Sequence, residues 1–357
     1  MKKAIIGIVI IIIIILVVRL GATEKPVSNE SDFIIGAVLP LTGPSALWGE
    51  TVKNGIELAL QGKDGIKVLY EDSKGMPADG ISAFTRLQEQ GVNLTLSELS
   101  SVSVPLSKIA LEKKIPFFVT LVAASSTVIV NEYTTRYYTD PAHYAGPSFT
   151  SPLSPVNAAK KIAILYRNDE LGNSVRDEIK RLGAQYGKEV VFIDSFKPAE
   201  TDFSTLISKI KASSANVLIF VPATPGEGVG IVKTAARLGL AIPMVEAGAV
   251  FADADNRKQV EGISFYSTSY DFSLVSDESA NFRAQYKAMF NKEPNFGAAF
   301  GYDVFNLIDS CKTKGVGEKK DIRECLRNIP VNQGIAGTAN QVLPGDFVAT
   351  MHLEKVE

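Results

Sequence analysis

The alternation of short apolar runs with longer segments that carry one apolar face constrains the fold of this chain more than any other feature. Phe33–Leu39 is a continuous apolar run, and Glu50–Gln61 carries apolar residues at helical spacing. The first pattern is typical of a strand buried on both faces, and the second indicates an amphipathic helix. The same pair recurs, with strands expected at Lys67–Tyr70, Asn93–Leu96 and Phe117–Val119 and helices at Ala78–Gln90 and Val104–Lys113. This alternation predicts a parallel sheet covered by helices on both faces.

A second series of the same kind follows a stretch between Pro141 and Pro155 that is rich in Pro, Ser and Gly. Its expected strands are Lys161–Tyr166, Val190–Phe196, Asn216–Val221, Ile242–Glu246 and Gly262–Tyr266, and its helices lie at Leu171–Tyr186, Phe203–Ile210 and Gly228–Leu238. The later expected elements are three helices, Ser276–Phe290, Ala298–Lys312 and Asp321–Arg327, and a hairpin over Gly334–Val356. The sequence therefore predicts two α/β units, and the chain returns late to the first. A length of 357 residues suits two domains of roughly 100–200 residues each.

The N-terminus resembles a membrane or export segment. Residues 4–18 are apolar apart from Gly7, with Lys2 and Lys3 before them and Arg19 after them. A basic start followed by a short apolar stretch is typical of a signal peptide, and the stretch is shorter than the roughly 20 residues of a spanning helix. We expect residues 1–30 to be a signal peptide or signal-anchor plus linker, with cleavage left open. The lysines predict that the rest of the chain lies outside the cytoplasm, in the periplasm or at the cell surface.

The two cysteines suit an oxidising compartment. Cys311 and Cys325 flank a Gly-rich turn between two expected helices. A disulfide there would join two helix ends and stabilise the fold by roughly 3 kcal/mol. The alternative is a pair of unrelated buried thiols.

Composition excludes several classes of function. The net charge is −2, whereas a nucleic-acid-binding protein needs a basic excess. Only two histidines are present, His143 and His352, and no catalytic elbow, phosphate loop or metal-spaced histidine pair is found. We expect no catalytic residue, no metal and no cofactor.

Ligands of open parallel sheets bind outside the carboxyl ends of the strands, so the loops after the strands are the candidate sites. The loop after the first strand carries Trp48, the only tryptophan, which either walls a ligand pocket or packs between the units. Hydroxyl groups cluster in the loops Ser97–Ser103 and Ala123–Thr127. Such groups either cap the following helix or bind a carboxylate together with backbone amides.

One segment imitates a dinucleotide-binding fingerprint. Pro225-Gly226-Glu227-Gly228-Val229-Gly230 follows a strand and opens a helix, and Glu246 lies twenty residues beyond Gly226. Ile231 stands where the third glycine belongs, and four residues separate the strand from the first glycine. A dinucleotide-dependent enzyme is therefore the remote alternative.

From Phe33 onward the chain resembles the type I periplasmic binding proteins, and more narrowly the branched-chain amino acid and amide group of ABC transporter substrate-binding proteins. The motifs that carry the resemblance are Ile35–Pro44, Trp48-Gly49, Asn54–Ala59, Tyr70–Ser73, Ile162–Tyr166, Thr201–Ser204, Ala235–Gly239, Gly301–Asp303, Gly337 and Gly345-Asp346. The resemblance implies an α/β fold of two Rossmann-like lobes joined by a three-segment hinge, with a ligand held between them. It assigns residues 31–139 and 272–335 to lobe one and residues 140–271 and 336–357 to lobe two.

The resemblance also implies a set of ligand-binding residues. Trp48 matches the family's aromatic residue on the first loop, Ser100 or Ser101 matches the first hydroxyl, and Ser125 matches the second. The aromatic positions of lobe two fall near Leu171 and Ala223, and the position of the acid that holds an ammonium falls beside Glu246. With neighbours on the same loops, the predicted set is Trp48, Ser100, Ser101, Ala124, Ser125, Thr224 and Glu246. If Glu246 faces the cleft, an α-amino acid fits; if it does not, a neutral or carboxylate-only ligand fits better.

We therefore expect an extracytoplasmic solute-binding protein that captures a small polar ligand, such as an amino acid, an amide or a small carboxylate. Its expected partners are an ABC transporter permease and the membrane at residues 4–18, with no nucleic acid. A membrane-tethered sensor that signals its closed form to another protein is the alternative.

Overall fold

The computed structural model describes residues 32–270, 277–313 and 319–357, and the N-terminal segment predicted to be a signal lies outside them. Residues from Phe33 to the C-terminus form one compact unit. Its first sheet contains β1 (Phe33–Leu39), β2 (Ile66–Asp72), β3 (Leu94–Glu98), β4 (Phe117–Thr120), β5 (Thr134–Tyr138), β11 (Val331–Gly334), β12 (Gly337–Leu343) and β13 (Asp346–Ala349). Its second sheet contains β6 (Lys161–Arg167), β7 (Glu189–Phe196), β8 (Val217–Val221), β9 (Met244–Glu246), β10 (Phe265–Tyr270) and β14 (Met351–Val356).

The parallel parts of the two sheets share one strand order. The first runs β2-β1-β3-β4-β5 and the second runs β7-β6-β8-β9-β10. In both sheets the order reverses beside the first strand, so a crevice opens at the carboxyl ends of β1 and β3 and of β6 and β8. The remaining strands extend the edges: β13 pairs in parallel with β5, and β14 pairs antiparallel with β10. The two predicted α/β units are confirmed.

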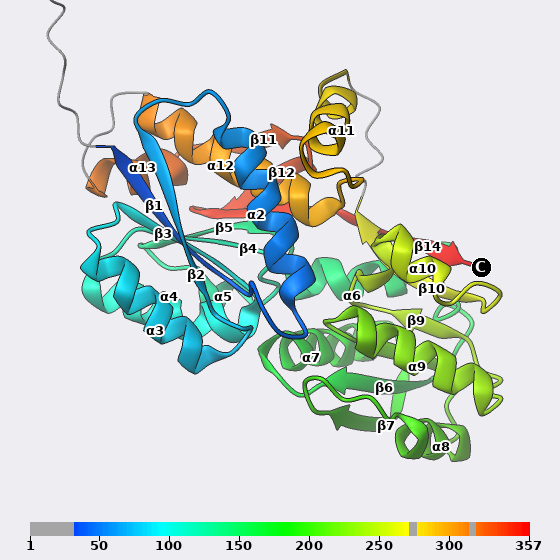
Figure 1. Ribbon diagram of the computed structural model, residues 1–357. Helices are drawn as coiled ribbons and strands as arrows, with labels where there is room; N and C mark the ends of the chain where they lie inside the picture. Colours follow the sequence, from blue (N-terminus) through cyan, green and yellow to red (C-terminus); the bar gives the residue numbers. More distant parts are fainter. Residues whose placement is uncertain (1–31, 271–276, 314–318) are drawn as a thin grey trace, which may run out of the picture. The chain divides into compact units, whose positions relative to one another are not determined.

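Helices cover both faces of the first sheet (Figure 1). The helices of this lobe are α2 (Ala46–Leu60), α3 (Pro77–Glu89), α4 (Ser100–Lys113), α5 (Ser126–Ile129), α11 (Asp277–Phe290), α12 (Phe296–Thr313) and α13 (Lys319–Arg327). α2 and α12 pack against the face that carries Leu94, Leu96 and Phe118. α3 and α4 pack against the opposite face through a separate apolar cluster. The apolar runs of the sequence are buried on both faces, as a parallel sheet requires.

The second sheet is covered in the same way. Its helices are α6 (Pro141–Thr150), α7 (Glu170–Gln185), α8 (Ser204–Ala212), α9 (Pro225–Arg237), the 3-10 turn η1 (Val250–Ala252) and α10 (Ala254–Lys258). α6 and α7 join the apolar cluster on one face, and α8 and α9 form the cluster on the other. We call the first sheet with its helices lobe one, and the second sheet with its helices lobe two.

The chain crosses between the lobes three times, as the expected fold requires. The crossings follow β5, β10 and β13. The third crossing differs from the expected boundary at residues 335 and 336, because β12 and β13 belong to the sheet of lobe one. Only Thr350 separates β13 from β14. Of the C-terminal segment predicted for lobe two, the strand β14 (residues 351–356) is therefore the part that joins the sheet of that lobe. The expected terminal hairpin is therefore the β12–β13 pair, and its register with β5 buries Phe347 beside Tyr137.

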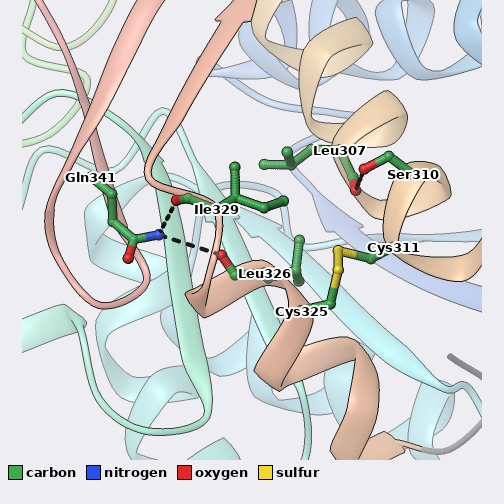
Figure 2. Close-up of a disulfide and its surroundings, with 7 residues drawn as sticks. All are labelled: Leu307, Ser310, Cys311, Cys325, Leu326, Ile329 and Gln341. Carbon is green, nitrogen blue, oxygen red and sulfur yellow. Dashed lines mark hydrogen bonds between the residues drawn. A yellow bond between two sulfur atoms is a disulfide. The ribbon is translucent and has the colours of Figure 1, made fainter. Parts of the chain in front are cut away.

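The predicted disulfide between Cys311 and Cys325 is formed, and it joins α12 to α13 (Figure 2). Beside it, the side-chain amide of Gln341 on β12 donates to the carbonyl oxygens of Ile329, at 2.7 Å, and Leu326, at 3.4 Å. These contacts tie the end of α13 to the edge of the sheet.

A buried ion pair fixes the join between β5 and β13. The Arg136 guanidinium donates from Nε to Asp346 Oδ1 at 2.7 Å and from Nη2 to Asp346 Oδ2 at 2.9 Å, and both side chains have no exposed surface. Arg136 also donates to the carbonyl oxygen of Ala124 and to the hydroxyl of Ser126. The loop after β4 is therefore shaped by an arginine from the neighbouring strand.

Candidate functional site

One pocket is lined from the crevices of both sheets. Lobe one contributes Trp48 from α2 after β1, Leu99, Ser100 and Ser101 after β3, Leu121 after β4, Tyr138 from β5 and Phe296 from α12. Lobe two contributes Tyr144 from α6, Arg167 at the end of β6, Asp169 after it, Leu171 from α7, Ala223 after β8 and Gly248 after β9. The strand order explains the convergence, because both crevices lie at carboxyl strand ends.

Trp48 both walls this pocket and joins the lobes. Its ring lies 5.2 Å from the ring of Phe296, and only 5% of the residue is exposed. Its indole Nε1 donates a hydrogen bond of 3.0 Å to the carbonyl oxygen of Ala223 in lobe two. Trp48 therefore lines the pocket and also packs between the lobes.

Ser100 and Ser101 begin helix α4 and line the pocket. Leu99, just before them, has φ +66° and ψ +133°, a sparsely populated backbone conformation that costs roughly 1–3 kcal/mol. Ser100 is buried, and its hydroxyl has no hydrogen-bond partner among the described residues. Ser100 Oγ caps nothing, so this hydroxyl and the positive end of α4 remain available to an acceptor.

Lobe two presents a charged cluster to the pocket. Arg167 Nε lies 2.9 Å from Asp169 Oδ2, and Arg167 Nη1 lies 3.6 Å from Glu227 Oε1. Asp169 caps α7 by accepting from the backbone N–H of Gly172. Burial raises the pKa of Asp169, and the charge of Arg167 opposes that effect. The sequence did not single out Arg167 or Asp169, although their position after the first strand of lobe two was a usable signal.

Three tyrosines meet between the lobes. The hydroxyls of Tyr138 and Tyr144 are 2.6 Å apart, and the Tyr270 hydroxyl donates to Tyr144 at 3.2 Å. Tyr138 ends β5 and Tyr270 ends β10, so two of the three crossings begin at this cluster. Burial raises the pKa of all three phenols, that of Tyr144 to about 12, so they stay protonated.

Glu246 does not line the pocket. It is fully buried behind Gly248, where it accepts from the Val250 N–H at 2.7 Å and the Ser267 hydroxyl at 2.5 Å. A Cβ atom on Gly248 would lie 2.9 Å from Glu246 Oε1, which places the carboxylate directly beneath that glycine. Burial raises the pKa of Glu246 to about 7. Glu246 therefore has a structural role beneath the pocket in this conformation.

The two predicted residues of the loop after β4, Ala124 and Ser125, lie in different surroundings. The Ala124 carbonyl oxygen accepts from Arg136 Nη1 at 2.5 Å, and the residue is fully buried. Ser125 forms a hydrogen bond with Thr127 and lines a different hollow, beside Asp140 and Glu170. The structure therefore brings Trp48, Ser100 and Ser101 together at one pocket, and Ala124 and Ser125 do not line it.

Thr224 and the glycine-rich segment have a helix-capping role. Thr224 is the N-cap of α9 and accepts from the Glu227 N–H, while Glu227 accepts from the N–H groups of Ala223 and Thr224. This reciprocal arrangement is a capping box. The Glu227 carboxylate therefore accepts from the two amides just before the segment that resembles a dinucleotide fingerprint. Among the described residues, no group of three or more His, Cys, Asp or Glu side chains could hold a metal ion.

A fully buried carboxyl group lies at the base of the Ser100 loop. Glu98 ends β3, and neither of its oxygens has a hydrogen-bond partner among the described residues. Burial raises the pKa of Glu98 well above its usual range.

Comparison with known proteins identifies the family. The model of the periplasmic binding protein family matches residues 33–350. The Leu/Ile/Val-binding protein homolog 3 of Brucella melitensis is 28% identical over 200 residues, which are 53% of this chain and 54% of that protein. The chain thus matches about half the length of this relative.

Solved structures share the fold. A leucine-binding protein of Thermotoga maritima has a TM-score of 0.80 at 20% identity, with 90% of this chain and 94% of that chain covered. A solute-binding protein of an ABC transporter from Rhodopseudomonas palustris, in complex with 3,4-dihydroxybenzoic acid, has a TM-score of 0.80 at 23% identity, with 92% and 94% covered. The resemblance seen in the sequence is confirmed, and the chain belongs to the periplasmic binding protein family.

Proposed function

We propose that this protein captures a small solute in the pocket between its lobes, outside the cytoplasm, and delivers it to an ABC transporter permease. The observation that carries the proposal is the convergence of both crevices on one pocket. Trp48 and Ser100 reach it from lobe one, and Arg167 and Ala223 reach it from lobe two. A ligand that touches both lobes favours their closed arrangement, because it binds that arrangement more tightly than the open one.

The lining supports a ligand with an apolar body and an acceptor group. Aromatic and aliphatic side chains form most of the wall, among them Trp48, Phe296 and Leu121. Ser100, with its unpartnered hydroxyl at the start of α4, suits a carboxylate. Glu246 lies beneath the pocket, and this supports a small carboxylate over an α-amino acid. The relatives are named for both kinds of ligand, leucine, isoleucine and valine on one hand and a benzoic acid on the other.

The extracytoplasmic location rests on the family and on the N-terminal sequence. No helix among the described residues is long and apolar enough to cross a membrane. Residues 4–18 lie outside the described part, and we propose that they direct export and either remain as an anchor or are removed.

A binding screen tests the proposal. We expect a ligand among amino acids, amides and small carboxylates to raise the melting temperature of the purified protein, because a ligand that binds only the folded state stabilises it. The same ligand should change the fluorescence of Trp48, whose indole bonds across the lobes, and Trp48→Phe should remove that signal while calorimetric binding persists. The absence of any stabilising solute would contradict solute capture.

Delivery is tested separately. The liganded protein should stimulate ATP hydrolysis by its cognate ABC transporter, reconstituted in proteoliposomes, more than the unliganded protein does. Equal stimulation with and without ligand would contradict delivery. Catalytic turnover of the bound solute would contradict a binding function.

A further inference from the structure

Arg167 presents hydrogen-bond donors to the pocket that no described residue uses. It is the last residue of β6, and its side chain lines the pocket together with Leu171. Its Nε has no hydrogen-bond partner despite lying 2.9 Å from Asp169 Oδ2, because the donor geometry is poor. Its Nη1 is 3.6 Å from Glu227 Oε1, too far for a hydrogen bond. The charges of Asp169 and Glu227 therefore hold the guanidinium in place, while its N–H groups form no hydrogen bond with a described residue.

The two carboxylates that hold Arg167 are themselves bound by backbone amides. Asp169 Oδ1 accepts from Gly172 N at 3.0 Å, and Glu227 accepts from three backbone N–H groups of neighbouring loops. Each carboxylate lies at the start of a long helix, α7 or α9, whose N-terminus carries partial positive charge. These donors offset the acidic charge, so the cluster is arranged to fix the guanidinium.

The opposite wall also presents a donor. Ser100 Oγ is unpartnered within the described part of the chain, and it lines the same pocket from lobe one. Glu246, the acid considered for an ammonium, points to Val250 and Ser267 beneath the pocket. A ligand ammonium would thus meet donors on both walls and the like charge of Arg167.

We propose that the ligand carries a second oxygen acceptor, a hydroxyl, carbonyl or carboxylate, which binds Arg167, and that it carries no ammonium group. The inference rests on the proposed function, because it names the class of solute bound in the same pocket. Arg167 is then the specificity-determining residue of lobe two. A ligand oxygen there satisfies a buried charged donor, which strengthens binding more than a contact between neutral groups does.

Asp169 provides the rival interpretation. It also lines the pocket, and an ammonium could bind its Oδ2 in place of the ion pair with Arg167. Asp169→Asn separates the two cases, because asparagine caps a helix as well as aspartate does and the variant keeps α7 intact. Arg167→Gln and Arg167→Lys both remove the guanidinium. The lysine variant keeps a positive charge beside Asp169 and Glu227, so it is the variant to test if the glutamine variant does not fold.

The experiment uses calorimetry on the full chain with two matched series of probes. The first is L-leucine, 4-methyl-2-oxopentanoate and 4-methylpentanoate, which share a carboxylate and differ in an ammonium, an oxygen acceptor or neither. The second is benzoate and 3,4-dihydroxybenzoate, in which the acceptors lie across a ring from the carboxylate.

We expect the acceptor-bearing probe of at least one series to bind about 10-fold to 100-fold more tightly than the probe without an acceptor. Arg167→Lys or Arg167→Gln should abolish that difference, and Asp169→Asn should not. Arg181→Gln, which removes an exposed guanidinium from α7, should leave all affinities unchanged. The inference is wrong if L-leucine binds most tightly and Asp169→Asn removes its binding, or if the Arg167 variants keep the acceptor preference. If no probe and no solute of the wider screen binds, the proposed function itself is overturned.

Discussion

Removing Asp346 from the buried pair with Arg136 should destabilise the protein more than any exposed ion pair can. The pair contributes two charge-assisted hydrogen bonds, at 2.7 and 2.9 Å, between side chains with no exposed surface. Asp346→Ala leaves the buried Arg136 guanidinium with hydrogen bonds to the neutral oxygens of Ala124, Val122 and Ser126 alone. The Asp140 carboxylate then remains as a charge that interacts with Arg136 without forming an ion pair with it. The register of β13 on β5 depends on the same contact.

The magnitude follows from two independent estimates. Two charge-assisted hydrogen bonds at about 1.5–3 kcal/mol each give a loss of about 3–6 kcal/mol. Measurements on broken buried pairs give about 3–5 kcal/mol. The two ranges agree near 4 kcal/mol, a large part of the roughly 5–15 kcal/mol by which a folded domain is stable.

Urea unfolding followed by circular dichroism measures the loss. The midpoint should fall in Asp346→Ala while the slope stays constant, since a change in slope would report a different folded or unfolded state. Lys258→Ala, which breaks an exposed ion pair with Asp255, is the matched control and should not move the midpoint. Replacing both partners, with Arg136→Met and Asp346→Leu, should recover most of the loss because no charge stays buried. A loss below about 1 kcal/mol in Asp346→Ala would refute the reasoning.

Three further outcomes follow from other contacts. Replacing Cys311 and Cys325 by serine should lower the free energy of unfolding by about 3 kcal/mol, measured by urea unfolding against the oxidised wild type, and equal stability would contradict a constraining role for the disulfide. Glu246 has a folded pKa raised to about 7, so its contribution to stability is complete below about pH 4 and is lost as the pH rises through 7, by about 3 kcal/mol in all. Glu246→Gln should reduce the loss of melting temperature between pH 4 and 8 by this share, while Asp303, whose pKa burial also raises to about 7, keeps its own share. An unchanged profile would show that Glu246 does not contribute to the loss. Gly55→Ala should destabilise by roughly 2–3 kcal/mol or more, because its Cβ would lie 2.0 Å from the Ala298 carbonyl oxygen where α2 crosses α12; an unaltered melting temperature would show that the helices can move apart.

Most of the fold could be predicted from the sequence because parallel strands are apolar on both faces and leave uninterrupted runs. The strand β5 was missed because its segment, Thr134–Tyr138, contains Arg136, and a charged residue in a central strand gives no apolar run. Its buried partner Asp346 is 210 positions away in the sequence. No helix was predicted over α6, because Pro141 and Pro147 lie within it, although Asp140 caps its first turn.

The pocket-lining residues that could be predicted are those in the connections that follow the strands of lobe one. Trp48 and Ser100 line the pocket because their loops leave the crevice of lobe one. Arg167 was not predicted, because one of its two charge partners, Glu227 at the start of α9, is far from it in the sequence. Ser125 lies in another hollow because Arg136 bends its loop, and the direction of a loop is set by such tertiary contacts.

The single residue between β13 and β14 has a mechanical consequence. Successive Cα atoms are 3.8 Å apart, so a one-residue connection between two hydrogen-bonded strands contains no slack. The lobes cannot slide past one another or separate at Thr350, and relative motion there reduces to torsion about the backbone angles of this residue. Thr350 is then one of three points about which the lobes can rotate, together with the crossings after β5 and β10. A glycine inserted beside Thr350 would make this connection longer and more flexible. The free energy of solute binding would then be coupled less tightly to closure of the lobes.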